Sequence, residues 1–191
     1  ILGGDGSDSI DGGDGNDTVT AGNGSDNVIA GNGNDSILGN NGEDTLDGGS
    51  GNDTINGDGG NDTINGGTGD DQILGGELND QILGGTGNDN IDGQAGNDQI
   101  IGSDGNDTLV GGQGNDSLTG GNGTDVINGG AGNDTAQGND GDDTIYGGSG
   151  DDSLLGDGTD VTSGDYQNLN SGRALLANYI QVFRRPVRVS P

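Results

Sequence analysis

The sequence of 191 residues contains 48 glycines, 33 acidic residues and four basic ones, so its formal net charge is −29. Aromatic residues make up 2%, and Cys, His, Met and Trp are absent. This composition excludes a disulfide framework and an ordinary globular core, and no apolar run approaches the roughly 20 residues of a membrane span.

The charges are separated along the chain. Every acidic residue precedes residue 172, whereas the four basic residues are Arg173, Arg184, Arg185 and Arg188. Nucleic acid is excluded as a partner of the acidic part, because binding phosphates requires Lys and Arg. Small divalent cations are the expected partners of such a chain.

A period of nine residues begins at Gly3 and gives seventeen complete rows without insertion or deletion, ending at Leu155. We number the positions of each row as places one to nine. Place six is Asp in all seventeen rows, place four is Gly in sixteen and place eight is Ile, Val or Leu in sixteen. Place five is Asn in ten rows and is expected to be solvated. Ile1 and Leu2 fit the last places of a preceding row, so we expect the sequence to be cut from a longer array.

Each row divides into two parts. Places one to six, Gly-Gly-x-Gly-x-Asp, predict a tight loop, because glycine tolerates positive φ and lets backbones approach closely. Places seven to nine predict a very short strand with the place-eight aliphatic inward and its neighbours outward. Nine residues then form half a turn of a flattened coil, and successive 18-residue turns stack about 4.8 Å apart as parallel strands. The predicted fold class is therefore all-β, a parallel β-roll.

The row Gly-Gly-x-Gly-x-Asp-x-aliphatic-x resembles the nonapeptide of the repeats-in-toxin (RTX, haemolysin-type) calcium-binding proteins over residues 1–155. The resemblance implies a right-handed, β-helix-like solenoid with Ca²⁺ in its turns. It also implies a secreted, extracellular bacterial protein that leaves the cell by type I export machinery and folds when calcium becomes available.

Two loops on the same side of the coil, one turn apart, offer a pair of aspartates to one ion, for example Asp53 with Asp71. By resemblance, backbone carbonyls from places one to four complete the shell of a cation that prefers six to eight oxygens. Nine loops on one edge and eight on the other allow up to about 15 Ca²⁺. The expected metal ligands are the place-six residues Asp8, Asp17, Asp26, Asp35, Asp44, Asp53, Asp62, Asp71, Asp80, Asp89, Asp98, Asp107, Asp116, Asp125, Asp134, Asp143 and Asp152.

The leading functional hypothesis is a calcium-binding module that is disordered without the metal, because rows of stacked aspartates repel one another. An enzyme is not expected here, since no His, Cys or Lys can form an ordinary nucleophile–base pair. One alternative is a calcium-stiffened spacer or adhesin stalk on the cell surface. Another is an accessory module of a secreted protease, lipase, epimerase or toxin whose active domain lies outside this chain.

Three features depart from the repeat. Leu78 replaces the place-four glycine, which is either neutral drift or a weakened metal site, and Ala136 leaves a gap in the aliphatic stripe. The aliphatic residues at place nine should face outward. We expect residues 1–155 to form the roll and 156–172 a terminal turn or cap. Residues 173–191 then form a C-terminal tail that serves as an export signal or a linker.

Overall fold

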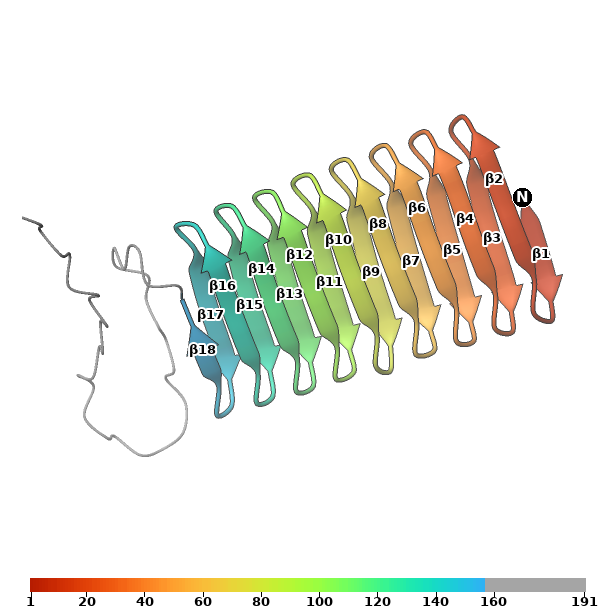
Figure 1. Ribbon diagram of the computed structural model, residues 1–191. Helices are drawn as coiled ribbons and strands as arrows, with labels where there is room; N and C mark the ends of the chain where they lie inside the picture. Colours follow the sequence, from red (N-terminus) through yellow and green to blue (C-terminus); the bar gives the residue numbers. More distant parts are fainter. Residues whose placement is uncertain (157–191) are drawn as a thin grey trace, which may run out of the picture.

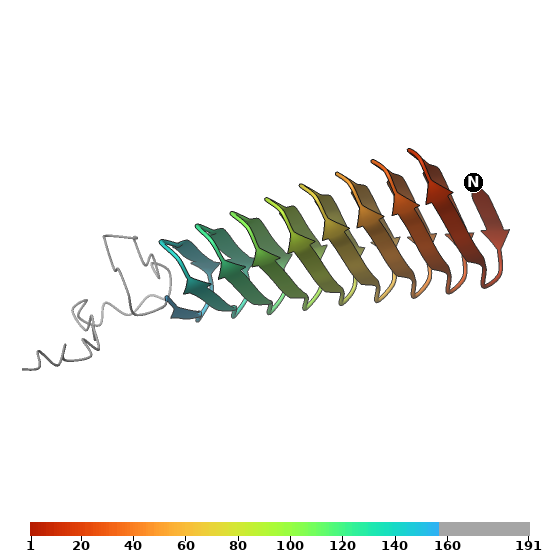
Figure 2. The same ribbon diagram turned by 45° about the horizontal axis from the view of Figure 1, so that its top comes forward.

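The computed structural model describes residues 1–156, which form eighteen β-strands and no helix. Within this range there is accordingly no helix that could cross a bilayer. Apart from residue 156, the predicted cap at 156–172 and the tail at 173–191 lie outside the described residues. The strands alternate between two nine-stranded parallel sheets, which face each other along a straight rod (Figures 1 and 2).

The odd-numbered strands form the first sheet in the order β1-β3-β5-β7-β9-β11-β13-β15-β17. Their bounds are β1 (Leu2–Asp5), β3 (Thr18–Asn23), β5 (Ser36–Asn41), β7 (Thr54–Gly59), β9 (Gln72–Glu77), β11 (Asn90–Ala95), β13 (Thr108–Gln113), β15 (Val126–Ala131) and β17 (Thr144–Ser149).

The even-numbered strands form the second sheet in the order β2-β4-β6-β8-β10-β12-β14-β16-β18. Their bounds are β2 (Ser9–Asp14), β4 (Asn27–Asn32), β6 (Thr45–Ser50), β8 (Thr63–Thr68), β10 (Gln81–Thr86), β12 (Gln99–Asp104), β14 (Ser117–Asn122), β16 (Thr135–Asp140) and β18 (Ser153–Leu155).

The register is the same throughout: every residue pairs with the one 18 positions away. Ile55 of β7 is opposite Ile73 of β9, which is opposite Ile91 of β11. Two rows therefore make one turn of the coil, as the nine-residue period predicts. The all-β parallel roll is confirmed.

The strands are longer than predicted. A typical strand has six residues and covers places seven to nine together with places one to three of the next row, so that only places four to six form the turn. The prediction that places one to three belong to the loop is wrong. Glycine here lets successive turns approach closely, since a Cβ on Gly22 or Gly39 would meet a carbonyl of an adjacent turn. Its backbone still pairs in the sheet, so its presence does not mark a loop.

The core is a double stripe of aliphatic side chains between the sheets. Sixteen of its eighteen members occupy place eight, from Ile10 to Ile145, and the other two are Ala21 and Ala30 at place one. Ala136 is completely buried among them. Place nine faces outward as predicted: Ile29, Leu74, Leu83 and Leu155 are exposed, while Leu38, Ile101 and Val110 are half-buried.

Candidate metal centre

The turns at places four to six lie in two rows along the edges of the rod (Figure 1). The place-four N–H donates to the place-three carbonyl of the next turn, as from Gly69 to Thr86 at 2.7 Å. The place-six carbonyl accepts from the place-seven N–H of the next turn, as from Gln72 to Asp53 at 2.8 Å. These two bonds tie each turn to its neighbour and set the spacing of the place-six aspartates.

The structure brings the seventeen predicted aspartates into two continuous rows. One edge carries nine of them, Asp8, Asp26, Asp44, Asp62, Asp80, Asp98, Asp116, Asp134 and Asp152. The other edge carries eight, Asp17, Asp35, Asp53, Asp71, Asp89, Asp107, Asp125 and Asp143. Thirteen of the seventeen are buried, with at most 3% of their surface exposed, which is unusual for an ionisable side chain.

In fifteen of the seventeen aspartates, one carboxylate oxygen accepts a hydrogen bond from the backbone of the preceding turn. Oδ1 of Asp71 accepts from the N–H of Asp53 at 2.8 Å, and Oδ1 of Asp89 accepts from the N–H of Asp71 at 2.9 Å. Fifteen such bonds, from Asp26 to Asp152 as acceptors, span 2.7–3.0 Å. Each pair of aspartates predicted to share an ion is thus in direct contact through this bond.

The other oxygen has no such partner. In sixteen of the seventeen aspartates, all except Asp143, Oδ2 is buried and accepts no hydrogen bond from residues 1–156. An unpaired buried carboxylate oxygen costs several times more than an unpaired neutral group. The same cost recurs along both edges, so the feature belongs to the repeat and not to a local packing fault.

These Oδ2 atoms converge with a backbone carbonyl beside the place-one glycine. A Cβ built on Gly39 would lie 2.7 Å from Oδ2 of Asp44 and 2.7 Å from the carbonyl oxygen of Gly57. The same pair of neighbours, one carboxylate and one carbonyl from the next turn, surrounds Gly93 and Gly75. Because place one has no side chain, a space remains there that is lined by two oxygens, one from a carboxylate and one from a carbonyl.

The electrostatics of the rows favour a cation. Burial raises the pKa of Asp71 and of Asp80 to about 7, and repulsion from neighbouring aspartates adds to this, although the bond from the preceding backbone N–H opposes it. Burial likewise raises the pKa of Asp62, Asp98 and Asp107 to about 6. The carboxylate form is thus penalised when no positive charge is nearby.

This donor set fits Ca²⁺, a hard cation that takes carboxylate and carbonyl oxygens. No three acidic side chains converge on one point within residues 1–156, so carboxylates alone do not make a site. The unpaired Oδ2 atoms and the place-one carbonyls would hold the ion. Bound calcium would supply the positive charge that these oxygens lack.

Leu78 disturbs one junction without displacing its aspartate. Asp80 in the same row keeps its bond from Asp62 at 2.8 Å. The Leu78 backbone is in the left-handed region at φ 77°, and its N–H lacks the place-four bond that its counterparts make within residues 1–156. The neighbouring bond from Gly60 to Glu77 is lengthened to 3.2 Å. The structure therefore shows a weakened backbone ladder beside Leu78.

The place-five side chains have a structural role that was not predicted from the sequence. Its side chains accept from the place-five N–H of the following turn, as Asn79 does from Asn97 at 2.7 Å. Eleven such bonds run in the direction opposite to those of place six. The predominance of Asn at place five was the available signal, because a carboxamide accepts such a bond without adding charge.

Comparison with known proteins agrees with this geometry. No curated protein matches the chain. The family model of the RTX calcium-binding nonapeptide repeat, which spans four copies of the repeat, matches residues 2–37, 38–73, 74–109, 101–136 and 129–162. The matches cover almost all of the described residues. The chain therefore belongs to the RTX calcium-binding nonapeptide repeat family and is a calcium-binding repeat module.

Proposed function

We propose that this module folds when calcium occupies its turns, and that the metal is part of the fold. The observation that carries the proposal is the buried, unpaired Oδ2 repeated along both edges. Without a cation, two rows of carboxylates are desolvated and repel one another. An ion that binds only the folded state shifts the equilibrium towards it.

The proposed ligands are the seventeen place-six aspartates together with carbonyls of the glycine-rich strand ends. Fifteen pairs of stacked aspartates are linked by the Oδ1 bonds, so the capacity is up to about 15 Ca²⁺. Fifteen divalent ions bring about +30, close to the formal net charge of −29. Calcium thus provides the counter-charge that the protein itself does not contain.

The family is typical of secreted bacterial proteins, and we extend this to the present chain. An unfolded acidic chain suits passage through a type I exporter, and external calcium then acts as the folding signal. Extracellular calcium modules of the EF-hand type bind in the range of about 10⁻⁴–10⁻³ M, and a comparable affinity would keep the module unfolded in the cytosol.

A solenoid built only from repeats suggests a structural module and not a catalytic one. The register of 18 residues continues without a break from β1 to β18, which favours a calcium-stiffened spacer or stalk as the role of the roll. We propose that residues 1–155 act as this one unit. A catalytic or pore-forming activity of the parent protein would belong to a different domain.

The test is a calcium titration of the metal-free chain at neutral pH, followed by circular dichroism. The sheet signal should rise cooperatively and disappear when excess chelator is added, and magnesium should not replace calcium. Calorimetry under the same conditions should count many ions for each chain. A roll that keeps its sheet signal in excess chelator at neutral pH contradicts the proposal.

A further inference from the structure

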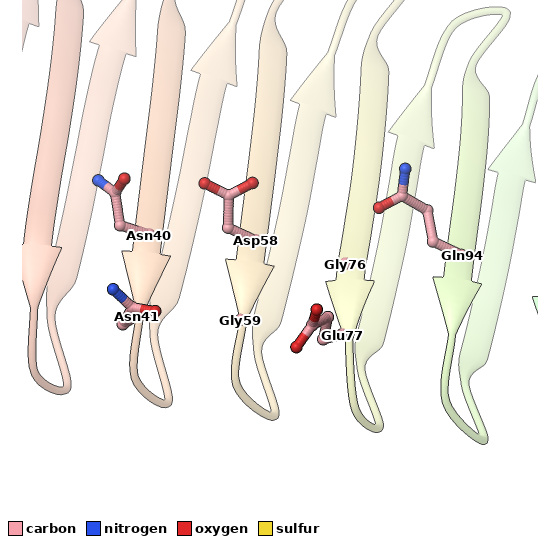
Figure 3. Close-up of a pocket in the computed structure, with 7 residues that line it drawn as sticks. All are labelled: Asn40, Asn41, Asp58, Gly59, Gly76, Glu77 and Gln94. Carbon is pink, nitrogen blue, oxygen red and sulfur yellow. The ribbon is translucent and has the colours of Figure 1, made fainter.

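A hollow lies on the outer face of the odd-numbered sheet, near the ends of its strands. It has a volume of about 410 Å³ and is lined by Asn40, Asn41, Asp58, Gly59, Gly76, Glu77 and Gln94 of β5, β7, β9 and β11 (Figure 3). This volume is in the range of small-molecule sites. None of these residues takes part in the place-six contacts described above.

The hollow is formed by departures from glycine at place two. This place is glycine in twelve of the seventeen rows, and φ is positive in all of them. The five exceptions are Asn40, Asp58, Gln94, Ser103 and Asn139, with φ between 67° and 90°. A side chain in this region of φ costs about 1 kcal/mol or more, so each exception carries a penalty that glycine avoids.

Three of the five exceptions lie together. Asn40 pairs with Asp58, Asp58 with Gly76 and Gly76 with Gln94 across β5, β7, β9 and β11. Gly76 thus lies between two place-two side chains, and it is the only place-two residue within 1–156 that is buried. Its backbone forms the floor of the hollow, and the flanking Asp58 and Gln94 form the walls (Figure 3).

Two of the three are held in place by the residue two positions earlier. Asn56 donates from Nδ2 to Oδ1 of Asp58 at 2.6 Å, and its own Oδ1 accepts from the Asp58 N–H at 3.3 Å. Oδ1 of Asp92 accepts from the Gln94 N–H at 3.0 Å. The Asp58 side chain and the Gln94 backbone are therefore fixed before any ligand binds, which lowers the entropic cost of binding.

The free groups around the hollow combine donors with acceptors. The side chains of Asn40, Glu77 and Gln94 make no hydrogen bond within residues 1–156, so two carboxamides and one carboxylate are available to a ligand. Anionic ligands are excluded, because residues 1–156 contain many carboxylates and no basic side chain. A purely cationic ligand would use the carboxylates and leave the carboxamide N–H groups to solvent.

We propose that this hollow binds a neutral saccharide, whose vicinal hydroxyls both donate and accept. Carboxamides and carboxylates are planar groups that can bond two adjacent hydroxyls at once. Leu74 precedes Gly76 by two residues on the same outer face and is 39% exposed. Its side chain offers an apolar surface beside the floor for the C–H face of a sugar ring.

The test uses the calcium-loaded chain, with maltotriose, cellotriose and chitotriose as neutral probes and spermidine as a cationic probe. The triple variant Asn40→Gly, Asp58→Gly, Gln94→Gly restores the repeat and relieves the strain, so it should fold and melt at a higher temperature. Its affinity for a trisaccharide that binds the wild type should fall about tenfold or more, since several hydrogen bonds are lost. Leu74→Thr should weaken binding several-fold.

The matched control is the double variant Ser103→Gly, Asn139→Gly, which makes the same change on the even-numbered sheet. It should also melt at a higher temperature but bind the trisaccharide as the wild type does. Circular dichroism serves as the control that every variant is folded. The proposal is overturned if no trisaccharide binds the wild type, if the triple variant binds as tightly as the control, or if only spermidine binds at these residues.

Discussion

The turns and the outer faces of the roll follow different rules. At the turns, place six is Asp in every row and the same bonds recur from one end of the rod to the other. On the outer faces, place nine changes from Leu38 to Asn56 to Leu74 to Asp92 along four neighbouring strands. A position is uniform where every row must meet the same buried neighbours, and it varies where solvent is the neighbour.

The acidic residues of the turns also differ from those of the outer faces. Asp80 is buried with one oxygen bonded and the other unpaired, whereas Asp92 on the outer face is half-buried and bonds the local backbone of Gln94. Only the buried aspartates of the turns need a counter-charge to offset the cost of their desolvation. Changes at the turns should therefore act through calcium, and changes on the faces should not.

The largest effect should come from pH in the absence of calcium. The pKa of Asp71 and Asp80 is raised from 3.8 to about 7 in the folded roll. The folded chain therefore binds protons more tightly than the unfolded chain, and stability falls as pH rises from 3.8 through about 7. Circular dichroism of the metal-free chain should show more sheet at about pH 4 than at about pH 8.

The same shifts predict that calcium affinity weakens as pH falls below about 7, because protons compete for the buried carboxylates. A calcium titration at several pH values measures this. A metal-free sheet signal that grows as pH rises would show that the turns are not strained by their own charge.

The next effect is the loss of a core side chain. Ile64→Ala in β8 should lower the free energy of unfolding in calcium by about 2–5 kcal/mol, because truncating a fully buried side chain leaves a cavity. The control Leu83→Ala in neighbouring β10 removes a place-nine side chain that is 39% exposed and should cost about 0.5 kcal/mol or less. Urea denaturation in saturating calcium measures both. Equal costs would mean that inner and outer aliphatics are not distinguished as the structure shows.

A smaller effect is expected from Asp80→Asn at a turn. The amide keeps an acceptor for the N–H of Asp62 but loses the charge that a metal needs, so stability in calcium should fall by about 1–3 kcal/mol. Calorimetry should count one or two fewer calcium ions. Asp92→Asn on the outer face should leave the ion count unchanged. An unchanged count in Asp80→Asn would remove that residue from the proposed ligands.

The smallest effect should follow from Leu78→Gly. Glycine tolerates the φ of 77° and can restore the missing place-four bond, so stability should rise by about 1 kcal/mol. Thermal unfolding measures the gain, and slower amide exchange at residue 78 would report the restored bond. The opposite substitution at place four of the preceding row, Gly69→Leu, should destabilise the roll, since a Cβ there would overlap the carbonyl of Gly51. A lower melting temperature for Leu78→Gly would show that Leu78 is favourable in its turn.

The coil, the inward place-eight stripe and the alignment of the aspartates follow from the amino-acid sequence, because all three depend only on the period and on strand alternation. Asp53 and Asp71 had to be neighbours once two rows made one turn. The outward place-nine residues, such as Leu83, followed from the same alternation.

The tertiary structure alone decided where the strands end and what each oxygen meets. Glycine at places one to three predicts a loop in an isolated segment, yet Gly75 is buried in a strand, where its missing side chain makes room for Oδ2 of Asp80. The opposite directions of the place-five and place-six bonds, and the hollow above Gly76, also arise between turns. These features depend on contacts between residues 18 positions apart, whose geometry is set only when the turns are stacked.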